Sequence, residues 1–420
     1  MSLINFTNLL IVLIVVQLTI NNCLDLDEVD KKNIPDIIEA RGFICETHYI
    51  TTSDGYILGN YRIVNPLMPK SFAYPQLKPI ILQSGFLGSG VDFIIASPRG
   101  FVNQSIALNA NELDLIDFDL DGRNLGFILA NLGYDVWLTN PRGNFYSTNH
   151  TTLDPESREF WSFSLDQMAN IDLPAMVDYV LQVTGRETIG YIGFSRGSLV
   201  MFGLLADQPN YSKKINPFVS IAPPIFLKNF DSPFRILACS ELVAKFIRDH
   251  PRSCFPRSIL RLEGICSYIL IKPLCDMIRL NLLSLDVYTA NSSRLEIYFS
   301  HLPAGSSCWD FVHFAQRITN NHFMHLDFGS DYNLKHYGSE KPPIYNLLNV
   351  NSTNIMIIQS TGDKTTNPTD VQHLIDELPV PPIERVKIED ENFSHLDFLF
   401  NNNAGLLVNR PIAEFLANNL

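Results

Sequence analysis

The chain has 420 residues, of which 46% are hydrophobic and 18% are charged, with 44 acidic residues against 31 basic ones and a net charge of −13. At roughly 150 residues per domain, this length predicts two or three domains, or one large core with an insertion. The low charge and high apolar content exclude a disordered chain, a collagen and a coiled coil. No block of Lys or Arg could follow a phosphate backbone, so we expect no nucleic acid partner.

The first element is an apolar stretch from Leu9 to Ile20. Its length is typical of the hydrophobic region of a signal peptide and is too short to span a bilayer. We predict a signal peptide over residues 1–23, with cleavage near Asn22 to Leu24, and no transmembrane segment in the mature chain. The alternative is a short buried helix or an uncleaved anchor, because the residues before Leu9 include no Lys or Arg.

Two further features agree with the secretory pathway. Glycosylation acceptors of the form Asn-x-Ser/Thr occur at Asn103, Asn149, Asn210, Asn291 and Asn351, with another at Asn392. The mature chain keeps an even number of cysteines, namely Cys45, Cys239, Cys254, Cys266, Cys275 and Cys308. An oxidising compartment permits disulfides among them, but the sequence alone does not choose the pairs.

The remaining pattern predicts an α/β fold interrupted once. Alternation from Cys45 to Ile63 around Ser53-Asp54-Gly55 predicts a hairpin. Short apolar runs typical of strands buried on both faces of a parallel sheet occur at Pro79–Gln83, Tyr134–Leu138, Thr188–Ile192, Phe218–Ile221, Ile355–Gln359 and Arg385–Ile388. Helical periodicity lies between them, for example at Leu125–Leu132 and Ser164–Val183. We therefore expect a mostly parallel sheet flanked by helices.

The alternation stops between residues 226 and 345. This stretch contains amphipathic segments and no convincing buried strand. We predict a helical cap inserted at 226–345, so that the core consists of residues 24–225 and 346–420.

The first chemical motif is Gly193-Phe194-Ser195-Arg196-Gly197, which has the form G-x-S-x-G. A predicted strand precedes it and an apolar helix from Ser198 to Leu205 follows. On such a sharp strand-to-helix turn, glycines remove the Cβ clashes that the turn would create. The pentapeptide alone is moderate evidence, but the strand and helix around it predict Ser195 as a nucleophile.

A serine nucleophile needs a base and an acid that orients the base. In α/β-hydrolases these follow in the order Ser, acid, His, each after a later strand. Asp363 follows the strand at 355–359 and His395 follows the strand at 385–388, so we predict both as partners of Ser195. Asp370 and Asp397 are less suitable acids, because one lies on a helix and the other is two residues from the base.

Acyl transfer also needs N–H donors for the oxyanion, usually from the residue after the nucleophile and from a loop after an early strand. These positions are Arg196 and Phe86, the latter after Gln83-Ser84-Gly85. The alternative for the neighbouring glycines is an ordinary turn. A dinucleotide-binding motif fails there, because its third glycine position is Phe93.

With these residues assigned, the chain resembles the acid lipase family, the gastric and lysosomal lipases of the α/β-hydrolase fold. The matching segments are Gly133–Leu138 with Arg142–Asn144, Glu159–Ser164, Asp172–Ala175, Ser300–Ser306 and Ser394–Phe398. The resemblance implies the same catalytic assignments, a cap over the site and a disulfide between Cys266 and Cys275. The chain differs from the family at two positions: Ser84 stands where the family usually has His, and Arg196 where it usually has Gln. The segment 90–123 is also longer than in the family pattern.

That longer segment includes Asp117-Phe118-Asp119-Leu120-Asp121-Gly122, the first half of an EF-hand loop. The twelfth position is Ile128 instead of Glu, so a solvated acidic loop is the better interpretation, and we expect no metal or cofactor.

The function we expect is a secreted or lysosomal lipase that hydrolyses carboxylic esters of neutral lipids, triacylglycerol or cholesteryl ester, through a Ser-His-Asp acyl-enzyme mechanism. Its partners would be a neutral lipid and the lipid–water interface. Two alternatives stay open. One is a catalytically weak lipase-like carrier of lipids, motivated by Ser84 and Arg196, and the other is a short-chain esterase.

Overall fold

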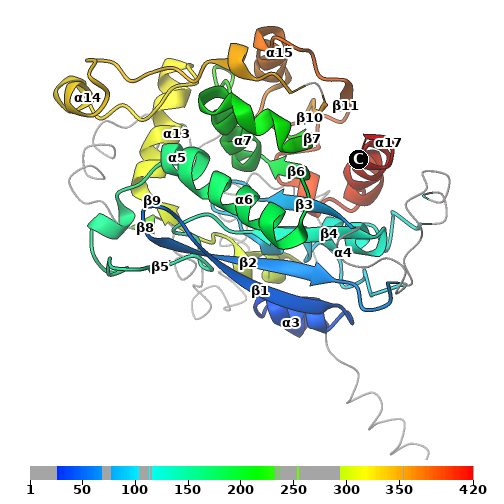
Figure 1. Cartoon of the computed structure of the whole chain (residues 1–420). Helices are drawn as coiled ribbons and strands as arrows, with labels where there is room; N and C mark the ends of the chain where they lie inside the picture. The colour runs from blue at the N-terminus through cyan, green and yellow to red at the C-terminus, as the bar shows by residue number, and fades with distance from the viewer. Residues whose placement is uncertain are drawn as a thin grey trace, which may run out of the picture.

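The computed structural model describes residues 26–68, 77–103, 113, 116–231, 235, 253–254, 294–352 and 354–419 (Figure 1). The predicted signal peptide, the Cys266–Cys275 pair and the acceptor Asn291 lie outside these residues. Within them, every helix is too short or too polar to span a bilayer.

The core is a 9-stranded sheet in the order β1-β2-β4-β3-β6-β7-β10-β11, with β5 paired to β2. The strands β1 and β2 are antiparallel, as are β2 and β4. In the remaining part of the sheet, β4-β3-β6-β7-β10-β11, all neighbouring strands are parallel. Their bounds are β1 Ile44–Thr51, β2 Tyr56–Val64, β3 Lys78–Gln83, β4 Tyr134–Thr139, β5 Asn149–His150, β6 Ile189–Phe194, β7 Ile215–Ile221, β10 Ile355–Ser360 and β11 Glu384–Ile388. The predicted fold class is confirmed.

The strands are apolar on both sides because both faces of the sheet are covered. In β3, Ile80 and Leu82 point into one core cluster and Ile81 into the other. The first cluster includes residues of α3 Ile34–Glu39, α4 Leu125–Asn131, α12 Leu295–His301, α16 Asp397–Phe400 and α17 Arg410–Asn419. The second includes α5 Leu165–Gln167, α6 Leu173–Thr184, α7 Arg196–Asp207 and α15 Pro368–Glu377. Figure 1 shows α6 crossing in front of the strands.

The helix predicted over 164–183 is interrupted. Between α5 and α6, residues Met168–Asp172 form a π-helical turn. Pro174 lacks the N–H that would close the α-helical bond there. The Asp172 carboxylate meanwhile accepts the N–H and Nε of Arg142 at 3.0 and 2.8 Å. Periodicity predicts the helix but does not show this break.

In the region expected to form the cap, the described helices besides α12 are α13 Cys308–Asn320 and α14 Ser330–Tyr337. Two short strands, β8 Ser253–Cys254 and β9 Ser306–Ser307, pair antiparallel. We expected no buried strand there, and two-residue strands are too short to show a periodicity. A disulfide joins Cys254 to Cys308 with a Cα–Cα distance of 4.8 Å. The boundaries at 226 and 345 stay a prediction.

Candidate active site

Ser195 stands on the turn between β6 and α7. Its backbone has φ 52° and ψ −115°, a conformation that costs a non-glycine residue of order 1–3 kcal/mol. The turn is fixed on both sides, because the Ser195 N–H donates to the Ile221 carbonyl at 2.8 Å and the Ser195 carbonyl accepts the Leu199 N–H at 3.1 Å. The hydroxyl is therefore presented at the carboxyl edge of the sheet.

The two glycines of the motif are required by close backbone approach. A Cβ on Gly193 would lie 2.6 Å from the backbone of Gly197 and Ser198. A Cβ on Gly197 would lie 2.2 Å from the Gln83 carbonyl oxygen, at the end of β3. The glycines thus let the turn close and let it pack against the strand that leads to Phe86.

Three side chains distant in sequence meet at this turn. His395 Nε2 lies 2.8 Å from Ser195 Oγ, and His395 Nδ1 lies 2.8 Å from Asp363 Oδ2. All three residues are buried. The ring of His395 also packs on Phe194, the residue before the nucleophile, with 5.1 Å between ring centroids.

Asp363 is held as a carboxylate by several donors. Its Oδ1 accepts the N–H groups of Thr365 and Thr366 at 2.8 and 3.0 Å, and its Oδ2 accepts the Thr366 hydroxyl. Burial raises the pKa of Asp363, but the facing His395 ring and the Thr366 donors outweigh it, so the pKa lies below its usual value. An ionised Asp363 accepts a hydrogen bond from the Nδ1–H of His395, which leaves Nε2 free of a proton and able to accept a hydrogen bond from the Ser195 hydroxyl.

The two acids that we judged less suitable from the sequence have other partners, and so does His373, the histidine of α15. The Asp370 carboxylate accepts the N–H and the Nδ2 of Asn229 at 2.8 and 2.9 Å. Asp397 accepts the N–H and hydroxyl of Ser394 at 2.7 and 2.6 Å, and so fixes the turn that carries His395. His373 stacks on Phe226.

The loop after β3 lies against the nucleophile turn. A Cβ on Gly85 would come within 3.2 Å of the Ser195 Cβ. The Gly88 N–H donates to the Gly85 carbonyl at 3.2 Å, and Leu87 has φ +60°, so Phe86 is the second residue of a closed turn and its N–H takes no part in that bond. Arg196 is the first residue of α7, where the N–H has no partner within the helix.

Three residues that we did not predict from the sequence hold this loop. The Ala304 N–H donates to the Leu87 carbonyl at 2.6 Å, Asn144 Nδ2 donates to the Gly88 carbonyl at 3.0 Å, and Asn140 Oδ1 accepts the Gly90 N–H at 3.0 Å. Asn144 and Ala304 both lie in segments that carry the family resemblance. The family resemblance could therefore have pointed to these two residues. Their contacts with the loop could not be predicted, because they join parts of the chain that are far apart in sequence.

Ser84, where the family usually has His, pairs with another residue missed from the sequence. Its hydroxyl donates to Asp92 Oδ2, which also accepts the Ser89 N–H at 3.0 Å. Asp92 is fully buried, and burial raises its pKa from 3.8 to about 7 despite these two donors. Ser84, which replaces the usual His of the family, therefore forms a buried polar pair with Asp92 inside the loop.

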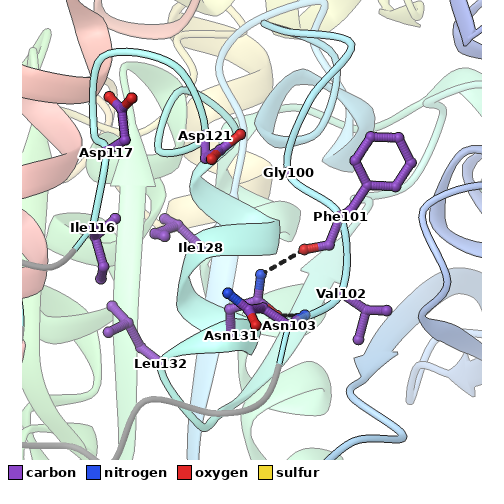
Figure 2. A pocket seen from close by; sticks show the side chains of 10 residues that line it. All are labelled: Gly100, Phe101, Val102, Asn103, Ile116, Asp117, Asp121, Ile128, Asn131 and Leu132. Carbon is purple, nitrogen blue, oxygen red and sulfur yellow. Dashed lines mark hydrogen bonds between the residues drawn. The ribbon is translucent and has the colours of Figure 1, made fainter.

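In the half EF-hand segment, Asp117 accepts hydrogen bonds from the protein's own backbone. Asp117 Oδ1 accepts the N–H groups of Asp119 and Leu120, both at 3.1 Å, and no group of three potential metal ligands occurs among the described residues. Asp117 and Asp121 line a pocket of about 270 Å³ (Figure 2) together with apolar side chains such as Ile116, Ile128 and Leu132.

Five of the six glycosylation acceptors fall within the described ranges, and all five are exposed: Asn103, Asn149, Asn210, Asn351 and Asn392.

Comparison with known proteins agrees with the fold. A partial α/β-hydrolase lipase region matches residues 34–97, and the α/β-hydrolase fold matches residues 78–247. Gastric triacylglycerol lipase of Bos taurus is 32% identical over 390 residues, which cover 92% of this chain and 91% of that protein. Lipase member K of Homo sapiens is 33% identical over 352 residues, 82% of each chain, and human lipase member J is 32% identical over 394 residues, 92% of this chain and 100% of the relative.

A serine on this turn, in this sheet, defines an α/β-hydrolase. The chain belongs to the lipase family of that fold, the family of gastric lipase and lipase members J and K, and is a carboxylic ester hydrolase. The resemblance drawn from its motifs is confirmed.

Proposed function

We propose that this protein is a secreted or lysosomal lipase that hydrolyses neutral lipid esters, triacylglycerol or cholesteryl ester, through an acyl-enzyme on Ser195. One observation carries the proposal: the His395 ring bridges Ser195 Oγ and the Asp363 carboxylate with 2.8 Å on each side. A hydroxyl in this contact can lose its proton as it attacks, which a serine in water does not do.

In the first half-reaction, Ser195 Oγ forms a bond to the ester carbonyl carbon while its proton passes to His395 Nε2. The carbonyl oxygen becomes an oxyanion, which the N–H groups of Phe86 and Arg196 stabilise. Asp363 stabilises the imidazolium. When the intermediate collapses, the C–O bond to the alcohol breaks and His395 Nε2 gives the leaving oxygen its proton.

In the second half-reaction, water attacks the acyl carbon and gives its proton to the same Nε2. The second oxyanion uses the same donors. Its collapse returns the proton to Ser195 Oγ and releases the fatty acid, so that the enzyme is restored.

The choice of lipid substrates, the interface and the location rests on the relatives and on the sequence. The matched relatives carry the names gastric triacylglycerol lipase and lipase. The predicted helical cap at 226–345 would cover the acyl chain at the lipid–water interface. The apolar segment at 9–20 and the exposed acceptors, such as Asn149 and Asn351, support passage through the secretory pathway.

Replacement of the nucleophile tests the mechanism. We expect Ser195→Ala to lower kcat for an ester by at least about a thousandfold, because the remaining groups cannot form the acyl-enzyme. Ser198→Ala is the matched control: its hydroxyl, one turn along α7, donates to the Gly193 carbonyl at 2.6 Å. The control should keep activity within about tenfold, because it loses one neutral hydroxyl donor, which the carbonyls of Gly193 and Ile221 share. Unchanged hydrolysis in Ser195→Ala would contradict the assignment.

A substrate panel tests the substrate class. We expect emulsified triolein or cholesteryl oleate to be hydrolysed faster than p-nitrophenyl acetate at equal ester concentration, measured by fatty acid release. Cleavage of the short ester alone would indicate an esterase. Lack of Ser195 labelling by a fluorophosphonate, together with no turnover of any ester, would indicate a lipid carrier.

A further inference from the structure

The side chain of Arg196, the residue after the nucleophile, is buried and paired. Its Nη1 lies 2.5 Å from Asp310 Oδ2 and 3.2 Å from Ser306 Oγ. The Ser306 hydroxyl also donates to Asp310 Oδ2, at 2.7 Å. The positive charge is therefore matched by a carboxylate inside the protein and is not offered to a substrate.

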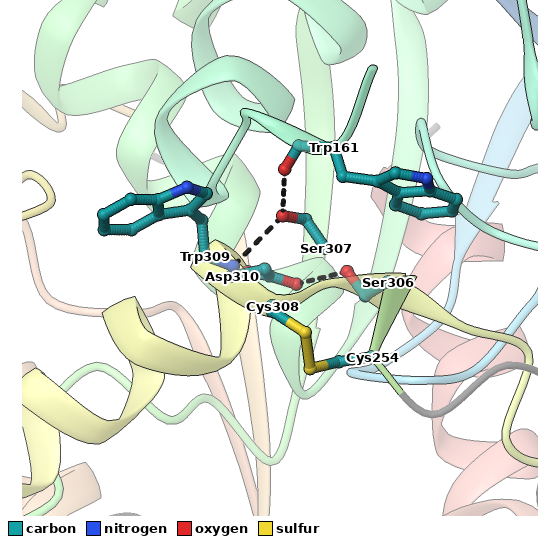
Figure 3. Close-up of a disulfide and its surroundings, with 7 residues drawn as sticks. All are labelled: Trp161, Cys254, Ser306, Ser307, Cys308, Trp309 and Asp310. Carbon is teal, nitrogen blue, oxygen red and sulfur yellow. Dashed lines mark hydrogen bonds between the residues drawn. A yellow bond between two sulfur atoms is a disulfide. The ribbon is translucent and has the colours of Figure 1, made fainter. Parts of the chain in front are cut away.

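Asp310 stands on a fixed part of the fold, the first turn of α13 (Figure 3). Ser307 caps this helix: its Oγ accepts the Trp309 N–H at 3.0 Å and donates to the Trp161 carbonyl at 2.5 Å. The first residue of the helix, Cys308, is joined to Cys254 by the disulfide. The cap and the disulfide therefore hold Asp310 at a fixed position opposite Arg196.

The same helix contacts the other oxyanion residue. The ring of Phe86 stacks on Phe314 of α13, with 5.7 Å between the centroids and 4° between the planes. The Arg196 guanidinium lies 5.6 Å from the centre of the Phe86 ring. Arg196 thus contacts both α13, through Asp310, and the residue that supplies the second N–H.

We infer that the Arg196–Asp310 ion pair, together with Ser306, positions the oxyanion hole by fastening the residues of both N–H donors to α13. The inference rests on the proposed roles of Ser195, Phe86 and Arg196. Oxyanion stabilisation depends on donors held in place before the charge forms, and Nη1 of Arg196 is held by both Asp310 Oδ2 and Ser306 Oγ. Arg196, through its side chain, and Asp310 are positioning residues.

The test compares an ester with its thionoester, for example p-nitrophenyl butyrate and its C=S analogue. The oxyanion accepts strongly from the two N–H groups, whereas sulfur is a weak acceptor. The ratio of kcat for the ester to kcat for the thionoester therefore reports on the oxyanion hole more than on the triad. A general structural defect lowers both rates and leaves the ratio unchanged.

Three variants are needed. Asp310→Asn and Arg196→Gln each leave a buried charge unpaired, which can destabilise the fold. The double variant Arg196→Gln/Asp310→Asn leaves no charge and keeps the inference testable if a single variant does not fold. Asp135→Asn is the matched control: Asp135, near the amino end of β4, holds the buried Arg62 at 2.6 Å.

We expect either single variant to lower kcat for the ester by on the order of ten- to a hundredfold, with KM within about threefold, and to lower the ester-to-thionoester ratio about tenfold. The double variant should lose less than the product of the two single losses, because the residues act as a pair. Asp135→Asn should keep the wild-type ratio.

A wild-type ratio in the single variants that fold and in the double variant would overturn the inference, as would an equal fall of the ratio in Asp135→Asn. Failure of the proposed function has a different signature: the unaltered protein would not be labelled at Ser195 by a fluorophosphonate.

Discussion

Asp92 is the buried carboxyl of the loop that carries Phe86. Burial raises its pKa from 3.8 to about 7. A group whose pKa is raised on folding binds its proton more tightly in the folded state than in the unfolded one, so folding is favoured while the group is protonated. This stability is fully present below about pH 4, the pKa of a free Asp, and is lost as the pH rises through about 7.

We therefore predict that Asp92→Asn stabilises the protein at pH 8 and has little effect at pH 4. An amide oxygen can still accept from Ser84 and Ser89 but carries no charge. A pKa raised from 3.8 to about 7 corresponds to a loss of roughly 4 kcal/mol in the free energy of unfolding between pH 4 and pH 8. Denaturant unfolding at the two pH values measures this. Asp376→Asn, at an exposed site, is the control, and equal effects of Asp92→Asn at both pH values would contradict the prediction.

At the scale of elements, His325 joins the chain after α13 to the helices over one face of the sheet. Its Nε2 lies 3.1 Å from Asp207 of α7 and its Nδ1 lies 3.4 Å from Asp166 of α5, while its ring stacks on Tyr345. Burial lowers the pKa of His325, but the two carboxylates outweigh it, so the pKa is raised above 6.5. His313, 3.8 Å from Asp166, has its pKa lowered by burial.

The two histidines therefore have opposite effects on stability. The contribution of His325 is fully present below pH 6.5 and is lost as the pH rises through its folded pKa; that of His313 is present above pH 6.5 and is lost on acidification. We predict that His325→Gln lowers the melting temperature more at pH 5 than at pH 8. His336→Gln, on α14, is the control. A larger loss at pH 8 would contradict the assigned charge of His325.

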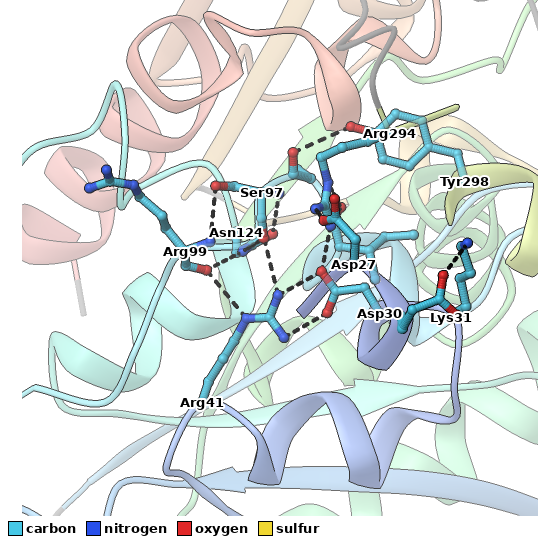
Figure 4. Close-up of polar contacts among 12 residues, drawn as sticks. Asp27, Asp30, Lys31, Arg41, Ser97, Arg99, Asn124, Arg294 and Tyr298 are labelled. Atoms are coloured by element: carbon cyan, nitrogen blue, oxygen red, sulfur yellow. Dashed lines mark hydrogen bonds and ion pairs between the residues drawn. The ribbon is translucent and has the colours of Figure 1, made fainter. Parts of the chain in front are cut away.

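At the scale of the whole molecule, an ion-pair network joins the N-terminal helix α2 Leu26–Asp30 to Arg41 and to Arg294, the residue before α12 (Figure 4). Asp30 is fully buried and pairs with Arg41 at 2.7 Å and with Arg294 at 2.5 Å. Arg294 Nε also donates to the Ile95 carbonyl at 3.2 Å, and the Asp30 carbonyl lies 2.5 Å from His301 Nε2. Four separate parts of the chain therefore meet at Asp30.

We predict that Asp30→Asn lowers the free energy of unfolding by about 3–5 kcal/mol, because two buried guanidinium groups lose their shared carboxylate. Thermal unfolding measures the loss, and ester hydrolysis below the melting temperature should stay near the wild-type rate. Glu28→Gln is the matched control on the same helix: its partner Lys31 is 2.7 Å away at the surface, and such pairs contribute about 0–1 kcal/mol. Equal losses in both variants would contradict a central role for Asp30.

Features of the fold were predictable from the sequence where the residues that cause them lie close together in the chain. Strands such as Ile355–Ser360 were predictable, because burial on both faces leaves a local run of apolar residues. Ser195 was predictable because the tight turn demands glycines two residues away on either side. Asp363 and His395 were predictable as positions, because the carboxyl ends of parallel strands meet at one edge of the sheet.

The sequence by itself determined the α/β fold, the family and the three residues that meet at Ser195, since each depends on short-range spacing or on the order of strands. Only the tertiary structure decided which side chains support them. Asp310 lies 114 residues from Arg196, and Cys308 lies 54 residues from Cys254, its disulfide partner. Such contacts depend on how distant segments pack, and a buried carboxylate or cysteine leaves no periodic trace in the residues beside it.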